Sequence, residues 1–241
     1  MGEDRLLGGR VRYRQPDEGF RSGIEPVLLA AGVPAGAEDR VLEGGTGAGA
    51  GLLCLAARVP GVQGVGVERD AGLAALAREN FAANKFAGLA VITGDLLAPA
   101  ARLAPGEEFD HAFANPPWHA AAGTEPLHPA RLAAKHGGEM LGAWMAALAA
   151  GLRRHGTLAL ILPVARMPAA LAAAAAAECG SPTVFPFWPR EGRAAKLVLV
   201  RVMRGGRGPP KLLAGLVLHG PDGRFTAAAE EVLRGGAALP L

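Results

Sequence analysis

The sequence contains only two cysteines, Cys54 and Cys179, and they stand far apart in apolar, helix-forming surroundings. Two isolated thiols offer neither a disulfide framework nor the paired spacing of a metal site, so we expect small core residues and no bound metal. No uncharged apolar run reaches the roughly 18 residues of a membrane span, and no basic and apolar leader opens the chain. These absences predict a protein of the reducing cytoplasm without a membrane partner.

Charged residues are also scarce, at 20% of the chain, whereas 50% of the residues are hydrophobic. This balance argues against extensive disorder and leaves ample material for a core. At 241 residues, we expect one catalytic domain. It divides into an N-terminal cap (1–36), a core (37–205) and a C-terminal extension (206–241).

Short apolar runs alternate with alanine- and leucine-rich segments from Arg40 onward, the pattern of an α/β fold with parallel strands and crossover helices. The last two runs are joined only by residues 188–195, too few for a helical crossover, which indicates an antiparallel pair. We therefore expect a mostly parallel sheet with one antiparallel strand. Its seven strands are predicted at 40–43, 64–68, 90–93, 109–114, 156–162, 183–187 and 196–203.

Further elements follow from local signals. Helices are expected to begin near Gly49, Ala71, Glu139 and Ala165, and a short helix is expected at 226–233 with Thr226 as its N-cap. Outside this framework, we expect a capping helix within 15–31, a loop at 120–138 and a strand at 212–218.

A glycine-rich loop, Glu43-Gly44-Gly45-Thr46-Gly47-Ala48-Gly49, joins the first predicted strand to the next helix. Glycines let the backbone approach a ligand closely, and the start of a helix presents free N–H groups, so a nucleotide-like ligand is implied. The loop alone does not identify that ligand, because Gly45, Gly47 and Ala50 also fit the pattern of dinucleotide dehydrogenases.

Carboxylates follow each of the first three strands. Glu68 ends the second strand, where it can accept hydrogen bonds from both hydroxyls of a ribose. Asp95 follows the third strand, where it can accept from an adenine amine or cap its own loop. Glu43 can approach the ammonium group of a methionine moiety, a cation that a dinucleotide lacks. The candidate cofactor-binding residues are Glu43, Gly45, Thr46, Gly47, Gly49, Glu68, Arg69, Asp95, Leu96 and Asn115.

The tetrapeptide Asn115-Pro116-Pro117-Trp118 after the fourth strand is the most specific feature of the sequence. Consecutive prolines fix the backbone and remove two N–H donors, so the Pro116 carbonyl and the Asn115 amide oxygen can face a substrate as acceptors. Acceptors that hold both hydrogens of an exocyclic amine favour a tetrahedral nitrogen and free its lone pair for attack on a sulfonium methyl. Trp118 offers a flat face for an unstacked base. We predict Asn115, Pro116, Pro117 and Trp118 as catalytic residues; a rigid turn is the alternative.

Positive charge is concentrated toward the C-terminal side, where residues 190–211 carry seven basic residues against the single acid Glu191. A further group of arginines at 5–21 is largely offset by nearby acids. If the fold brings these segments together they can contact phosphates, and a solvated basic face without a partner is the alternative. The candidate substrate-binding residues are Trp118, Arg21, Arg190, Arg193 and Lys196.

With the glycine loop, Glu68, Asp95 and the tetrapeptide in this order, the chain resembles class I S-adenosylmethionine-dependent methyltransferases that modify amino groups. More closely, it resembles the bacterial tRNA(Val) adenine-N6-methyltransferase family, whose members modify an adenine beside the anticodon. The likeness includes segments 19–23 and 187–190 and covers nearly the whole chain. It implies a Rossmann-like seven-stranded sheet, S-adenosylmethionine as cofactor and a tRNA partner.

Two positions depart from the family pattern. Trp118 stands where Tyr or Phe is usual, which leaves open the base that is admitted, and Glu43 stands where Asp is usual. The same two acceptors could also grip a guanine amine or a protein glutamine amide. A nicotinamide-dependent oxidoreductase would fit the glycine loop but would not need the tetrapeptide. The oligomeric state is left open.

Overall fold

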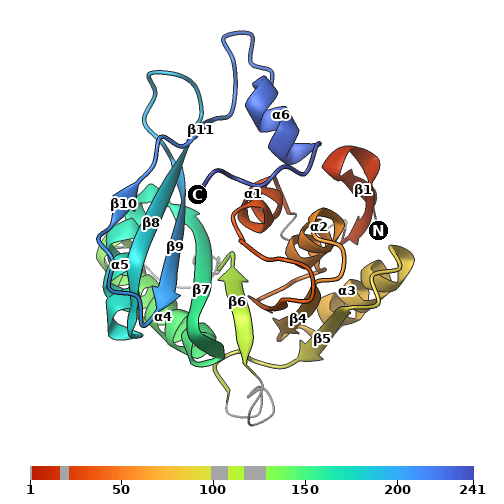
Figure 1. Cartoon of the computed structure of the whole chain (residues 1–241), viewed down its shortest axis with the longest axis horizontal. Coiled ribbons are helices and arrows are strands. Elements are labelled where there is room, and N and C mark those ends of the chain that lie inside the picture. Colours follow the sequence, from red (N-terminus) through yellow and green to blue (C-terminus); the bar gives the residue numbers. More distant parts are fainter. Residues whose placement is uncertain (1, 17–21, 99–107, 117–128) are drawn as a thin grey trace.

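The computed structural model describes residues 2–16, 22–98, 108–116 and 129–241. A single sheet crosses the molecule, in the order β10-β8-β9-β7-β6-β3-β4-β5, and β11 pairs with β8 beside β10 (Figure 1). Its strands are β3 (Arg40–Gly44), β4 (Gln63–Glu68), β5 (Leu89–Thr93), β6 (Phe109–Ala114), β7 (Leu152–Pro163), β8 (Cys179–Trp188), β9 (Leu197–Arg204), β10 (Lys211–Leu212) and β11 (Leu216–Val217).

The seven predicted strands are present, and β9 alone among them runs antiparallel to its neighbours β7 and β8. The expected α/β sheet with one antiparallel strand is therefore confirmed. The predicted strand at 212–218 is wrong in extent, because it is divided into the two-residue strands β10 and β11. Gly215, with a φ of 81°, turns the chain just before β11, and an extended strand cannot continue through that conformation.

Helices cover both faces of the sheet (Figure 1). Side chains alternate along β3, so that Val41 joins a core cluster with α1, α2 and α3, and Leu42 joins a second cluster with α4 and α5. Thr226 caps the short C-terminal helix as predicted, because its hydroxyl oxygen accepts from the Ala229 N–H at 3.1 Å. The helices are α1 (Glu25–Ala31), α2 (Ala50–Arg58), α3 (Ala71–Ala83), α4 (Pro129–Ala150), α5 (Met167–Ala176) and α6 (Ala227–Leu233).

The capping helix predicted within 15–31 is confirmed at its C-terminal end and is wrong at Gln15. A hairpin of β1 (Gly2–Leu6) and β2 (Val11–Gln15) precedes α1, so Gln15 lies in a strand and α1 begins only at Glu25; residues 17–21 lie outside the described residues. In β2, buried and exposed residues alternate, which is the period of a strand with one covered face. The side chain of Asn80 on α3 bonds both the N–H and the carbonyl of Arg14, and thereby replaces a neighbouring strand.

Helix α4 begins ten residues before the predicted start at Glu139. The expected loop at 120–138 is thus helical from Pro129, and its part at 120–128 lies outside the described residues. A proline suits the first turn of a helix. The pair Gly137-Gly138 has low helix propensity, so the sequence did not indicate that the helix continues through it. Within the described ranges no helix is long and apolar enough to cross a membrane.

Candidate active site

The carboxyl ends of four neighbouring parallel strands meet at one edge of the sheet. Gly44 at the end of β3 pairs with Val67 of β4 on one side and with Ala114 of β6 on the other. Glu68 in turn pairs with Thr93 at the end of β5. The glycine loop, the carboxylates after β4 and β5, and the residues after β6 are therefore gathered at one place, as expected for a ligand site in such a sheet.

The glycine loop is held by backbone hydrogen bonds. The N–H groups of Gly45 and Thr46 both donate to the Val67 carbonyl, at 2.8 and 3.2 Å. Gly45, Gly47 and Gly49 have φ values of 64°, 56° and 89°, a region that favours glycine. A Cβ at Gly47 would meet nothing within 4 Å, so this part of the loop is bordered by open space.

Glu68 is tied to the glycine loop by its side chain. One carboxylate oxygen accepts from the Gly47 N–H at 2.9 Å, and the other accepts from the Asp70 N–H at 2.9 Å. The residue is 8% exposed, so the carboxylate is nearly enclosed. It is thus fixed beside the open space at Gly47, where it can also accept from hydroxyl groups.

Glu43 lies beneath the loop. Its carboxyl group accepts from the Thr46 hydroxyl and from the Leu52 N–H in the first turn of α2. Burial is the main cause that raises its pKa, to about 8, and the charge of Glu68 raises it further. Glu43 therefore retains its proton near neutral pH and supports the loop from below. Contact with an ammonium group stays a prediction, and the Thr46 side chain is likewise turned inward.

The loop after β5 brings a capping contact and an apolar side chain. Asp95 accepts from the Leu97 N–H at 2.9 Å through Oδ1, the capping alternative named for this residue. Its other carboxylate oxygen has no partner among the described residues. Leu96 reaches the end of β3, where a Cβ on Gly44 would meet it at 2.9 Å. Arg69 after β4 is exposed.

Asn115 and Pro116 directly follow β6. Asn115 comes one residue after Ala114, which pairs with Gly44, so it leaves the sheet beside the start of the glycine loop. Pro116 is buried, and within the described ranges no residue bonds the Asn115 side chain. Pro117, Trp118 and Arg21 lie outside the described residues.

Comparison with known proteins agrees with this geometry. Residues 25–145 match the family description "methyltransferase small domain". The chain belongs to this family. A tRNA1(Val) (adenine(37)-N6)-methyltransferase of Aeromonas hydrophila is 31% identical over 210 residues, which cover 86% of each chain. A protein of the same name from Actinobacillus succinogenes is 33% identical over 188 residues, which cover 77% of each chain.

A solved structure shares the fold. A predicted O-methyltransferase from Agrobacterium tumefaciens superimposes with a TM-score of 0.73 at 24% identity, over 89% of this chain and 98% of that chain. The methyltransferase therefore has the class I fold that the sequence predicted, and it is an S-adenosylmethionine-dependent enzyme of the family to which the two curated relatives belong.

Trp144 of the methyltransferase was missed by sequence reasoning. A Cβ on Gly45 would meet the edge of its ring at 2.6 Å, so the half-buried indole stands directly against the glycine loop. On α4 it is spaced with Leu141, Met145 and Leu148, which are buried in the core. That spacing predicts only a core-facing helix, and the contact with the loop depends on how α4 crosses the sheet.

The basic stretch at 190–211 does not form one face. Arg190, Arg193 and Lys196 are exposed in the loop between β8 and β9, at the carboxyl edge of the parallel strands. Arg204 ends β9 seven residues after Leu197 begins it, about 23 Å away along an extended strand. The stretch therefore does not present a single phosphate-binding surface, because an antiparallel strand carries its two ends to opposite edges of the sheet.

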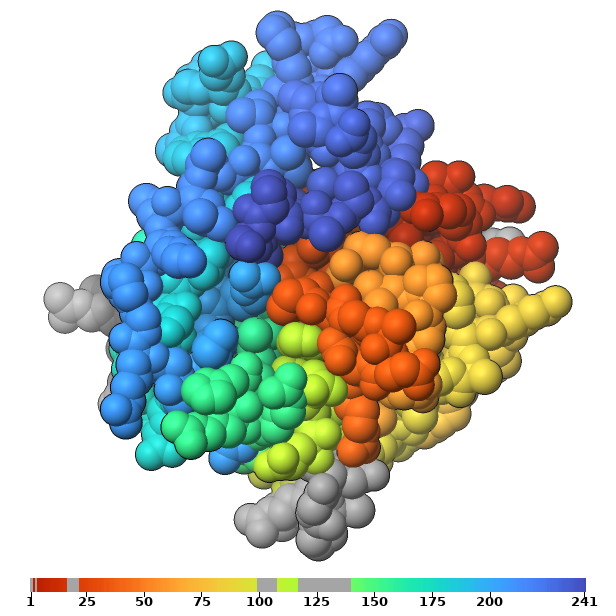
Figure 2. Space-filling model, viewed as in Figure 1, coloured from red at the N-terminus to blue at the C-terminus, as the bar shows by residue number. Residues whose placement is uncertain are grey.

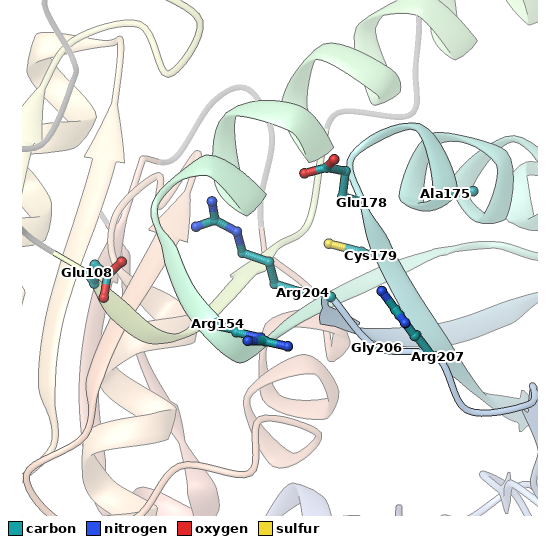
Figure 3. Close-up of a pocket in the computed structure, with 9 residues that line it drawn as sticks. Glu108, Arg154, Ala175, Glu178, Cys179, Arg204, Gly206 and Arg207 are labelled. Carbon is teal, nitrogen blue, oxygen red and sulfur yellow. The ribbon is translucent and has the colours of Figure 1, made fainter.

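The other half of the stretch borders a cavity of about 700 Å³ at the amino edge of the sheet, shown in Figure 3. Arg154, Arg204 and Arg207 line it together with Glu108 and Glu178, so positive and negative groups are mixed. The Arg204 guanidinium donates to the Leu152 carbonyl and thus fastens β9 to the start of β7. This cavity is remote from the glycine loop and from Asn115, and we assign it no part in methyl transfer.

Proposed function

We propose that the chain transfers a methyl group from S-adenosylmethionine to the N6 amine of an adenine in tRNA. The observation that carries the proposal is the juxtaposition of Asn115 and Pro116 with the glycine loop across neighbouring strands. The names of the two curated relatives support adenine N6 as the acceptor and tRNA as the partner. An enzyme that acts on tRNA works where tRNA is present, which supports the cytoplasm as its location.

The described residues fit the cofactor that the family requires. The space beside Gly47 admits a ligand against the backbone, and the Glu68 carboxylate at that space offers acceptors for two ribose hydroxyls. The second carboxylate oxygen of Asp95 suits the adenine amine, and Leu96 offers an apolar contact to the ring. When bound, S-adenosylmethionine supplies an electrophilic methyl group carried by a sulfonium.

The target amine is held by acceptors that follow β6. The Asn115 amide oxygen and the Pro116 carbonyl each accept one N–H, which turns the nitrogen lone pair away from the adenine ring. No strong base is required, because the amine becomes acidic as its lone pair is donated and then loses its proton to water. The part assigned to Pro117 is to fix the backbone, and Trp118 stacks on the flipped base; both remain predictions from the sequence.

The RNA side of the proposal rests on exposed cations at the same edge of the sheet. Arg190, Arg193 and Lys196 suit phosphates that flank the target base, and Arg21 is proposed for the same role from the sequence. We also propose that residues 1–241 act as one domain, with a cap (1–36), a core (37–205) and an extension (206–241). One hydrophobic cluster that contains Tyr13, Leu53 and Leu233 supports that organisation.

The deciding experiment incubates the full chain with total tRNA and labelled S-adenosylmethionine and then analyses the nucleosides. We expect label in N6-methyladenosine. Label in a methylated guanosine would replace the adenine by a guanine amine. If the RNA stays unlabelled and a parallel reaction with protein as acceptor is labelled, a glutamine amide is favoured. Label in neither acceptor would contradict the proposal.

Two variants separate catalysis from cofactor binding. Asn115→Ala should lower the transfer rate by roughly 100-fold or more, as removal of one polar contact to the reacting centre does, while the affinity for S-adenosylmethionine is retained. Glu68→Ala should weaken cofactor binding and leave transfer at saturating cofactor largely intact. Transfer at the wild-type rate by Asn115→Ala would exclude the proposed acceptor role.

A further inference from the structure

A second recess lies at the carboxyl edge, beyond the residues already assigned to the reaction. It is a groove of about 420 Å³, within the usual size range of small-ligand sites. One wall comes from the end of β8 and the loop at 189–196, and the other comes from β11 in the C-terminal extension. The lining residues are Trp188, Glu191, Gly192, Arg193, Ala194 and Val217.

The position of this groove relates it to the target base. β8 lies three strands from β6, through β7 and β9, which corresponds to about 14 Å across the sheet. Ala114 pairs with Leu160, whereas β7 continues to Pro163, so the strands next to the groove extend three residues, about 10 Å, beyond the end of β6. The groove therefore lies to one side of Asn115 across the sheet and farther out along the strand direction, where the nucleotides that flank a target base would pass.

The indole of Trp188 is held in place before any ligand arrives. The indole Nε1 donates to the Ala214 carbonyl at 2.9 Å, and the backbone carbonyl of Trp188 accepts from the Leu218 N–H at 2.8 Å. Trp188 also pairs with Val217 across the parallel strands β8 and β11. Gly215 lets the chain come close, because a Cβ there would lie 2.9 Å from the indole nitrogen. A ring fixed in this way can stack on a ligand with little loss of side-chain freedom.

The charges at the rim select the class of ligand. Arg190, Arg193 and Lys196 are exposed on the loop, against the exposed Glu191. The loop and the C-terminal extension project together from the body of the protein at the top of Figure 2, where a long polymer can reach them. An indole with arginines beside it suits a base that stacks while its phosphates are neutralised, and Glu191 can accept from an amino group on that base.

We propose that this groove binds an unpaired nucleobase that flanks the methylated adenine, with Trp188 as the stacking surface and Arg193 beside the backbone. The inference rests on the proposed function, since it requires an RNA substrate. It gives the C-terminal extension a part in substrate binding, because that segment contains Val217, which lines the groove, and Ala214, whose carbonyl accepts from the Trp188 indole.

The test measures binding of labelled total tRNA, affinity for S-adenosylmethionine and methyl transfer for the full chain and four variants. Trp188→Ala should weaken tRNA binding by roughly 5- to 150-fold, the range measured for loss of one stacked base, with unchanged cofactor affinity. Trp188→Phe should keep most of the binding, because a ring remains. Arg193→Ala should weaken binding and reduce its salt dependence. Arg207→Ala, an exposed arginine of the same stretch at the opposite edge, is the matched control and should behave as the wild type.

The outcomes separate this inference from the proposed function. A wild-type protein that methylates tRNA while Trp188→Ala binds tRNA equally well would overturn the groove and leave the function standing. Equal losses in Arg193→Ala and Arg207→Ala would also overturn it, since binding would then follow total charge. A loss of binding in Trp188→Phe equal to that in Trp188→Ala would remove the stacking role. A wild-type protein that methylates protein but no tRNA would refute both proposals.

Discussion

Gly47→Ala is the sharpest probe of where the cofactor lies. The new Cβ meets nothing within 4 Å, so the fold is penalised only for a left-handed residue with a φ of 56°. That penalty is about 1–2 kcal/mol, which corresponds to a fall in Tm of about 2–8 °C for a chain of this size. The methyl group, however, points into the space that we assign to the cofactor. If it displaces one hydrogen bond to the Glu68 carboxylate, worth about 1.5–3 kcal/mol, the Kd for S-adenosylmethionine rises roughly 10- to 150-fold.

Gly45→Ala is its matched control, two residues earlier in the same loop and with a φ of 64°. Here the Cβ meets the Trp144 ring at 2.6 Å, so overpacking of about 1–3 kcal/mol adds to the backbone penalty. Calorimetric titration with the cofactor and thermal unfolding should show that Gly47→Ala loses mainly affinity and Gly45→Ala mainly stability. Wild-type affinity in Gly47→Ala would refute the placement of the cofactor. Equal Tm values for the two variants would refute the contact with Trp144.

Two further predictions concern pH. Burial raises the folded pKa of Glu43 from 4.5 to about 8, so its contribution to stability is present below pH 4.5 and is lost as the pH rises toward 8. Glu43→Gln, whose side chain still accepts a hydrogen bond from Thr46, should therefore show a Tm that changes less with pH across that window. Parallel curves of Tm against pH for the variant and the wild type would contradict this. His111 bonds Asp39 at 3.2 Å and Thr157 at 2.8 Å, and burial lowers its pKa below 6.5. Because the unfolded chain then binds the proton more readily, stability should fall as the pH drops below 6.5. His111→Gln should remove part of that slope in acid unfolding measurements, and an unchanged slope would exclude His111 as its source.

The gathering of the candidate site residues at one edge of the sheet could be anticipated because its signals are local. Glycines that open a helix, a carboxylate that ends a strand and Asn115-Pro116 after β6 each have a signature within a few residues, and parallel strands bring their ends to one edge. Glu43 shows the limit of such reasoning. Its type and position predict contact with an ammonium group, which stays a prediction, and only the packing of α2 shows that the side chain is enclosed and that its pKa is raised. Desolvation depends on every neighbour in space, which sequence spacing does not report.

The N-terminal hairpin shows a similar limit. β2 pairs with β1 on one side, and on the other side its backbone is bonded by Asn80 and Asn84, which lie about 70 residues away in the chain. An asparagine usually lowers the helix propensity of its segment, and no local sequence signal indicates that the asparagine amide will bond the backbone of a distant strand. The same Asn80 also donates to the Ala48 carbonyl at 2.9 Å and so connects the hairpin to the glycine loop.

The sequence by itself determined the α/β class, the single reversed strand and the residue types that stand at the ends of the strands, because periodicity, loop length and residue type act over short distances. Only the tertiary structure decided which side chains face the site and which lie buried beneath it. It placed Trp144 against Gly45, divided the basic stretch between two edges of the sheet, and joined the C-terminal extension to Trp188. Each of these results depends on contacts between residues distant in the chain, where strand direction and helix packing, rather than local pattern, determine what meets.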